Sequence, residues 1–91
     1  MRRSKLWINL QAGRKLISVP GDHALIGVTG FFVREIQLPV GTPVIVQFCR
    51  GRDELSMRGI VSSSFADLGL SVEFEEGSGL AVQKLAAFLA A

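Results

Sequence analysis

Between Leu25 and Phe74, apolar residues recur at nearly every second position, and Gly or Pro stands where the alternation breaks. A period of two is typical of half-buried β-strands, while Gly and Pro mark the turns between them. The same alternation is present near the start of the chain, on both sides of a turn predicted at Ala12-Gly13. A sequence of this kind is constrained to fold as an antiparallel meander of short strands.

The alternation predicts six or seven strands, a mainly β fold. They are expected over residues 5–11, 14–19, 24–29, 31–36, 43–49, 55–63 and 69–75, with a bend or bulge at Gly30 and a loop over residues 64–68. Short antiparallel strands must avoid exposed edges, and closure into a small barrel removes those edges. We therefore expect a barrel.

The period changes after Gly77-Ser78-Gly79, where Ser78 is a good helix N-cap. From there to residue 90 the apolar residues recur at helical spacing and form one face, made of Ala81, Val82, Leu85, Phe88 and Leu89. The sequence predicts one amphipathic helix over about 79–90 that caps the barrel or lies across one side.

Composition narrows the possible classes. A hydrophobic content of 48% in 91 residues favours one folded domain and argues against disorder. The net charge of +2 is spread along the chain, unlike a polyanion-binding tail. Cys49 is the single cysteine, so no internal disulfide is possible, and we interpret it as a small strand hydrophobe. No signal peptide or bilayer-spanning stretch is expected, which predicts a cytoplasmic location.

Three blocks of the chain resemble the PilZ domain, a small bacterial β-barrel known as a receptor for cyclic di-GMP. They are a strand–Gly–strand followed by LPVGTPVIVQF, the strand LSMRGIV, and GLSVEF before the C-terminal helix. In the last block Ser71 replaces a second Gly of the family pattern. The resemblance implies a single PilZ-like domain over 1–91, with strands over about 5–75.

The family binds its nucleotide through two motifs, RxxxR near the N-terminus and D/N-x-S-x-x-G further on. Arg grips phosphate in a bidentate way and stacks on guanine, while the Asp, Ser and Gly supply polar partners and close approach. Here the second motif aligns with residues 25–30 and keeps only its last position, Gly30. Leu25 replaces the acid and Gly27 replaces the Ser.

The first motif is half present, since four residues after Arg2 and Arg3 stand Leu6 and Trp7 rather than a second Arg. Each lost charge-assisted hydrogen bond costs ~1.5–3 kcal/mol, so two or three losses reduce affinity by several powers of ten. We therefore expect no cofactor and no useful cyclic di-GMP binding. If binding is retained, the resemblance places it on Arg2, Arg3, Gly27 and Gly30, in a shifted clamp that also uses Arg14.

The chain has few candidates for chemistry. Asp22-His23 resembles a catalytic or metal pair, but one His and one Cys cannot assemble a common zinc or nucleophile site, so we expect no enzyme and no metal. Arg50, Arg52 and Arg58 suggest a basic rim of a small nucleic-acid-binding barrel, which is the second alternative function. That interpretation lacks an exposed aromatic stacking platform.

Adjacent Phe31 and Phe32 on one strand must point to opposite faces, so one of them points outward. Together with Trp7 they suggest an exposed apolar patch, although contact with the closing helix explains them equally well. The hypothesis favoured by the sequence is a PilZ-like signalling module with decayed nucleotide motifs. It would act as an adaptor that binds another protein or a second copy of itself, without membrane insertion or nucleic acid.

Overall fold

The computed structural model describes residues 5–27, 29–75 and 79–90. They form one seven-stranded antiparallel sheet, one short 3-10 helix and one α-helix. The elements are β1 (Leu6–Ala12), β2 (Lys15–Pro20), η1 (Gly21–His23), β3 (Ala24–Ile26), β4 (Gly30–Arg34), β5 (Pro43–Arg50), β6 (Asp53–Phe65), β7 (Gly69–Phe74) and α1 (Gly79–Ala90). The predicted mainly β fold with a C-terminal helix is confirmed.

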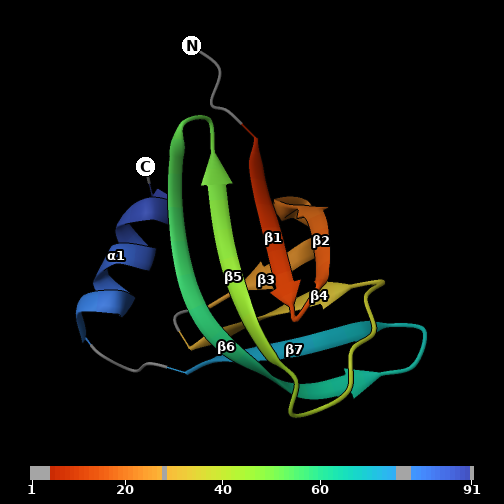
Figure 1. Ribbon diagram of the computed structural model, residues 1–91. Helices are drawn as coiled ribbons and strands as arrows, with labels where there is room; N and C mark the ends of the chain where they lie inside the picture. The colour runs from red at the N-terminus through yellow and green to blue at the C-terminus, as the bar shows by residue number, and fades with distance from the viewer. Residues whose placement is uncertain (1–4, 28, 76–78, 91) are drawn as a thin grey trace.

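The sheet curls into a half-barrel. Its strand order is β2-β1-β5-β6-β7-β4-β3, so β2 and β3 are the two edges and η1 joins them. Figure 1 shows β1 and β5 upright, β4 and β7 lying across below them, and β6 (green to teal) curving from one group to the other. β6 is long and has a bulge between Val61 and Ser63. It can therefore bend and contribute to both walls of the half-barrel, the one with β1 and β5 and the one with β4 and β7.

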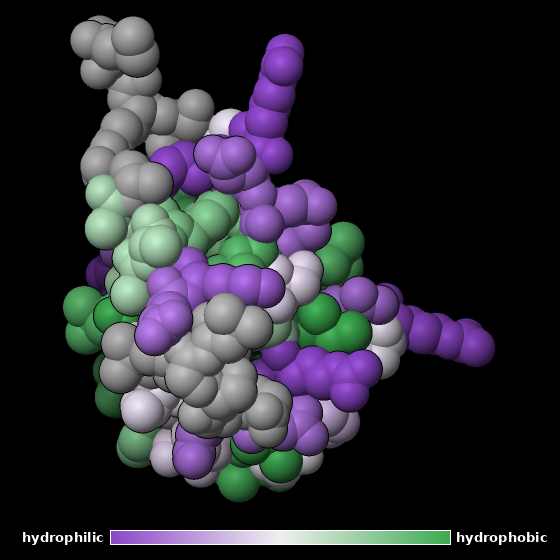
Figure 2. All heavy atoms as spheres, turned by 90° about the vertical axis from the view of Figure 1, so that its left-hand side faces the viewer, coloured by the Kyte–Doolittle hydropathy of each residue, from purple (hydrophilic) through white to green (hydrophobic). Residues whose placement is uncertain are grey.

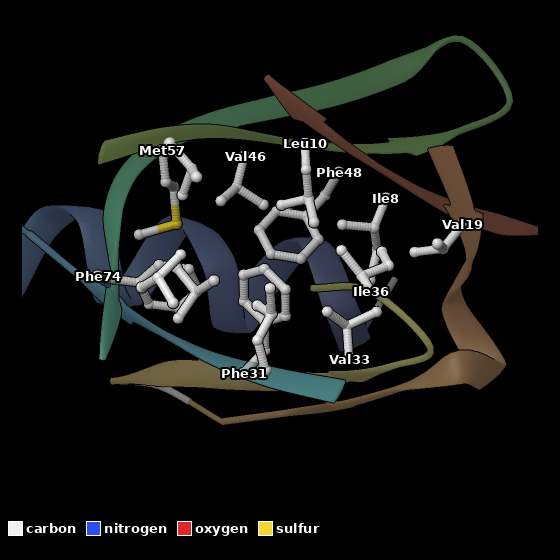
Figure 3. Packing of buried hydrophobic residues seen from close by; sticks show 14 of the residues in the cluster. Ile8, Leu10, Val19, Phe31, Val33, Ile36, Val46, Phe48, Met57 and Phe74 are labelled. Carbon is white, nitrogen blue, oxygen red and sulfur yellow. The ribbon is translucent and has the colours of Figure 1, made fainter. Parts of the chain in front are cut away.

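The core lies between the two walls and follows from the period of two. The inward residues of β5, Val44, Val46 and Phe48, are buried, and so are Leu70, Val72 and Phe74 of β7. Phe31, Phe48 and Phe74 point toward one another in Figure 3, with ring centroids 5.9 to 6.2 Å apart. Buried side chains among the described residues are all apolar, so the core contains no polar side chain of these residues.

Helix α1 closes one side of the half-barrel beside β6, as predicted from its apolar face. Leu85 is fully buried in the core, and Phe88 and Leu89 pack against it. From residue 83 onward its exposed positions are polar or small, and Figure 2 shows pale-green residues among projecting hydrophilic side chains on this side. Ser78, the expected N-cap, and the side chains of Ala81 and Val82 lie outside what the structure describes.

The differences from the predicted boundaries that bear on the outer face are in β3, β4 and β6. The segment 24–29 is not one strand, because β3 ends at Ile26 and a tight turn leads into β4, closed by the Gly27 N–H donating to the Gly30 carbonyl at 2.8 Å. Gly30 is therefore the first residue of β4 rather than a bend. β4 ends at Arg34, since Glu35 has a φ of 68° and leaves the strand. β6 continues past Ser63 to Phe65, where a loop was expected.

Arg50 ties α1 to the sheet. Its guanidinium donates to the Phe88 carbonyl at 3.1 Å and lies 5.8 Å from the centroid of the Phe88 ring. A cation near the last carbonyls of a helix also interacts favourably with the helix dipole. We expect Arg50→Ala to lower the free energy of unfolding by about 1–3 kcal/mol in urea denaturation. Arg52→Ala, at the exposed β5–β6 turn, is the matched control and should change stability by less than about 0.5 kcal/mol.

No described helix has both the length and the apolar character needed to cross a membrane.

Candidate functional site

The residues aligned with the family's second nucleotide motif lie on the β3–β4 hairpin. The Leu25 side chain is 77% exposed and points outward from β3. Gly27 lies in the turn, where a Cβ would meet nothing closer than 3.6 Å. Gly30 begins β4, where a Cβ would lie 2.2 Å from the Val72 carbonyl oxygen of β7. The side chains of an acid at position 25 and of a serine at position 27 would therefore fit. Lack of space does not explain why this chain has Leu25 and Gly27 instead.

A shallow depression lies on the outer face beside this hairpin. Its polar side chains are hydroxyls and one carboxylate, contributed by Thr29, Ser62, Ser71 and Glu73. Leu25 and Phe32 form its apolar border. The one charge among these lining residues is negative, so they offer a dianion no cation.

A second depression lies on the other side of Leu25 and Phe32. It is lined by Asp22 and His23 of η1 and by Arg34 of β4. Leu25 pairs with Phe32 across the hairpin, and both border each depression. The two side chains thus make a raised strip, hereafter the Leu25–Phe32 ridge, with Glu73 on one flank and Arg34 on the other.

The arginine motif is only partly described. Arg2 and Arg3 lie outside the described residues. At the two positions where a second Arg would stand, Leu6 packs against the core and Trp7 is 43% exposed, with the Lys5 ammonium 5.5 Å from its ring. Arg14 is exposed in the β1–β2 turn and does not line either depression. Neither described position supplies the missing cation.

The apolar patch expected from Trp7, Phe31 and Phe32 is not one surface. Phe31 is buried in the core. Phe32 points outward from β4, while Trp7 lies on β1, with β5, β6 and β7 between them in the sheet. The outward neighbour of Phe32 is instead Phe65, whose ring centroid is 6.3 Å away. Sequence reasoning missed Phe65 because residues 64–68 were assigned to a loop; an extension of the β6 alternation past the bulge would have found it.

A ladder of polar side chains crosses the outer face of the other wall. Ser18 donates to Asn9 at 2.6 Å, Asn9 to Gln47 at 3.1 Å, and Gln47 to Glu54 at 3.2 Å. Cys49 lies beside it, partly buried, and desolvation together with the nearby Glu54 carboxylate raises the pKa of its thiol. A thiol with a raised pKa is less often the reactive thiolate, in keeping with a structural role for Cys49.

The three arginines considered as a basic rim are not gathered. Arg50 contacts Phe88 of α1, and Arg52 lies at the β5–β6 turn. Arg58 is six residues further along β6, a span of roughly 20 Å in an extended strand. Among the described residues, no group of three or more His, Cys, Asp or Glu side chains is placed to hold a metal ion.

Comparison with known proteins places the fold. No family model matches the sequence, and no curated protein matches it. Among solved structures, the chain is similar to the PilZ domain of CeSA from a cellulose-synthesizing bacterium, with a TM-score of 0.67 at 14% identity. The similarity covers 100% of both chains. The fold of this chain is therefore PilZ-like, as its sequence blocks predicted.

Proposed function

We propose that this chain is a non-enzymatic, cytoplasmic module of bacterial signalling with a PilZ-like fold, and that it acts as an adaptor through protein contacts. In this proposal cyclic di-GMP is not its ligand. The PilZ-like fold supports the assignment to a signalling module. The residues of the β3–β4 hairpin support the proposal that the module does not bind cyclic di-GMP.

One observation carries the proposal. At the place where the family presents an acid and a hydroxyl, this chain presents an exposed Leu25 and a Gly27, beside the carboxylate of Glu73. A nucleotide phosphate brought to this face would meet a like charge, and guanine would find two polar partners missing. Each such loss costs roughly 1.5–3 kcal/mol, which corresponds to about a tenfold to hundredfold loss in affinity.

The same substitutions favour contact with protein. Leu25 is 77% exposed and Phe65 is 47% exposed, and half-buried Phe32 lies between the strands that carry them. Apolar side chains gathered on an outer face lose water favourably when a partner covers them. An adaptor that has exchanged polar nucleotide contacts for apolar ones is the function that this arrangement supports best.

Calorimetric titration of the full chain with cyclic di-GMP tests the proposal. We expect no binding at micromolar concentrations, because both motifs lack charged or polar groups. Binding at micromolar or tighter affinity, abolished by Arg2→Ala with Arg3→Ala, would contradict the proposal and favour a receptor with a shifted arginine clamp.

A variant with the motifs restored serves as the matched control. Leu25→Asp and Gly27→Ser rebuild the second motif at positions with room for both side chains, and Trp7→Arg completes RxxxR from Arg3. We expect cyclic di-GMP binding to appear in this triple variant, measured by the same titration. Its thermal unfolding should stay close to that of the parent chain, since all three positions are exposed.

A further inference from the structure

We propose that the Leu25–Phe32 ridge is the contact surface of a symmetric dimer, and that the partner seated on it is a second copy of this chain. This inference names a partner for the adaptor role and in that sense rests on the proposed function. Support for it comes from where the apolar, charged and glycine residues lie relative to one another on the outer face of the sheet formed by β3, β4, β7 and β6.

The pairing of the strands places these residues in three parallel rows. The central row is the ridge itself, Leu25 opposite Phe32, which is in turn opposite Ser71. The row on one side holds Arg34, Gly69 and Phe65. The row on the other side holds Gly30, Glu73 and Ile60.

The charges on the two flanking rows are opposite. Arg34 lies on β4 on one side of the ridge, and Glu73 lies on the neighbouring strand β7 on the other side. Suppose that two copies pack face to face and are related by a two-fold axis that runs along the ridge. The row with Arg34 in each copy then faces the row with Glu73 in the other copy. The axis therefore brings Arg34 of each copy beside Glu73 of the other, which gives two ion pairs around one apolar centre. Asp22 and His23 lie at the outer end of the Arg34 flank, in the same depression.

Glycines stand opposite the two charged side chains in this arrangement. With the axis along the ridge, Arg34 on β4 faces Gly30 of the partner, while Glu73 on β7 faces Gly69. Neither glycine can be replaced by a larger residue, because a Cβ would lie 2.2 Å or less from a backbone carbonyl oxygen. The positions opposite the two charged side chains therefore carry no side chain of their own.

The apolar residues match in the same way. Phe65 is 47% exposed on one flank and Ile60 is 42% exposed on the other, and both lie on β6. The two-fold axis therefore places Phe65 of each copy opposite Ile60 of the other copy. Leu25 and Phe32 meet their own copies at the centre. A surface whose opposite charges and apolar groups exchange under one two-fold rotation is complementary to itself in charge and polarity, as a symmetric dimer requires. The outer face of a half-barrel is convex, so we expect a small interface, below about 1,200 Å², with rapid exchange.

Sedimentation velocity of the full chain tests the inference over a concentration range of about 1 μM to 1 mM, where a weak dimer forms. We expect the average mass to rise with concentration toward that of two copies. Arg34→Glu and Glu73→Arg should each raise the dissociation constant at least about tenfold, because like charges then face each other. The double variant carrying both changes restores opposite charges and should return to within about threefold of the parent value.

Arg52→Glu makes the same charge change outside the face and is the control, and circular dichroism verifies that each variant is folded. A chain that stays monomeric over the whole range overturns the inference. A dimer that persists unchanged in both Arg34→Glu and Phe32→Glu overturns it as well, since another surface must then be in contact. If the chain is monomeric and does not bind cyclic di-GMP, the dimer inference is wrong but the proposed function is not contradicted. If the chain binds cyclic di-GMP, the proposed function is contradicted but the dimer inference is not.

Discussion

Gly30→Ala should destabilise this chain by about 3 kcal/mol or more, although it adds a single methyl group. The new Cβ would lie 2.2 Å from the Val72 carbonyl oxygen and 3.1 Å from the Glu73 Cα. Both atoms belong to the backbone of β7, which is paired with β4 on one side and β6 on the other. The overlap can be relieved only by separating strands, so the cost exceeds that of an ordinary overpacked side chain.

Gly27→Ala in the same hairpin is the matched control. A Cβ at position 27 meets no atom closer than 3.6 Å, and we expect a change of less than about 0.5 kcal/mol. Both free energies of unfolding can be measured by urea denaturation. Equal stability of the two variants would contradict the described approach of β4 to β7.

This prediction also bears on the nucleotide motif. Gly30 is the one position of the aligned segment that matches the second motif, and a packing requirement is sufficient to explain a glycine there. The two positions that differ from the motif, 25 and 27, are those where the sheet places no demand on the side chain. The match at Gly30 is therefore not evidence for nucleotide binding.

The alternation of apolar residues determined most of what could be predicted about the fold. It placed Val44, Val46 and Phe48 on the buried face of one strand and Leu70, Val72 and Phe74 on that of another, as the structure has them. The change of period after residue 79 likewise predicted α1 and the burial of Leu85. These predictions succeed because each depends on which face of one element is covered.

The boundaries that were wrong depend on contacts between elements. The end of β3 and the start of β4 are joined by a hydrogen bond from the Gly27 N–H to the Gly30 carbonyl, which no side-chain pattern records. β6 continues to Phe65 because β7 pairs with it beyond the bulge, and that pairing depends on the whole sheet. For the same reason the grouping of the Leu25–Phe32 ridge with Phe65 could not be predicted: the three residues come from three strands, and only the sheet order brings them to one face.

Adjacent Phe31 and Phe32 should respond in opposite ways to the same substitution. Phe31 is 4% exposed and its ring packs against those of Phe48 and Phe74, so Phe31→Ala leaves a cavity in the core. We expect it to lower the free energy of unfolding by about 3–5 kcal/mol. Phe32 points outward, with its ring beside that of Phe65, so Phe32→Ala should cost about 1 kcal/mol or less.

The effect on association should be the reverse. Phe32 lies at the centre of the ridge, where truncation of an aromatic anchor removes much of the contact between copies, so Phe32→Ala should weaken the dimer at least about tenfold. Phe31→Ala should leave association unchanged in the fraction of molecules that remain folded, because Phe31 does not reach the outer face. Urea denaturation and sedimentation velocity on the two variants measure these effects separately. Loss of stability in Phe32→Ala equal to that in Phe31→Ala would contradict the assignment of the two rings to opposite faces of β4.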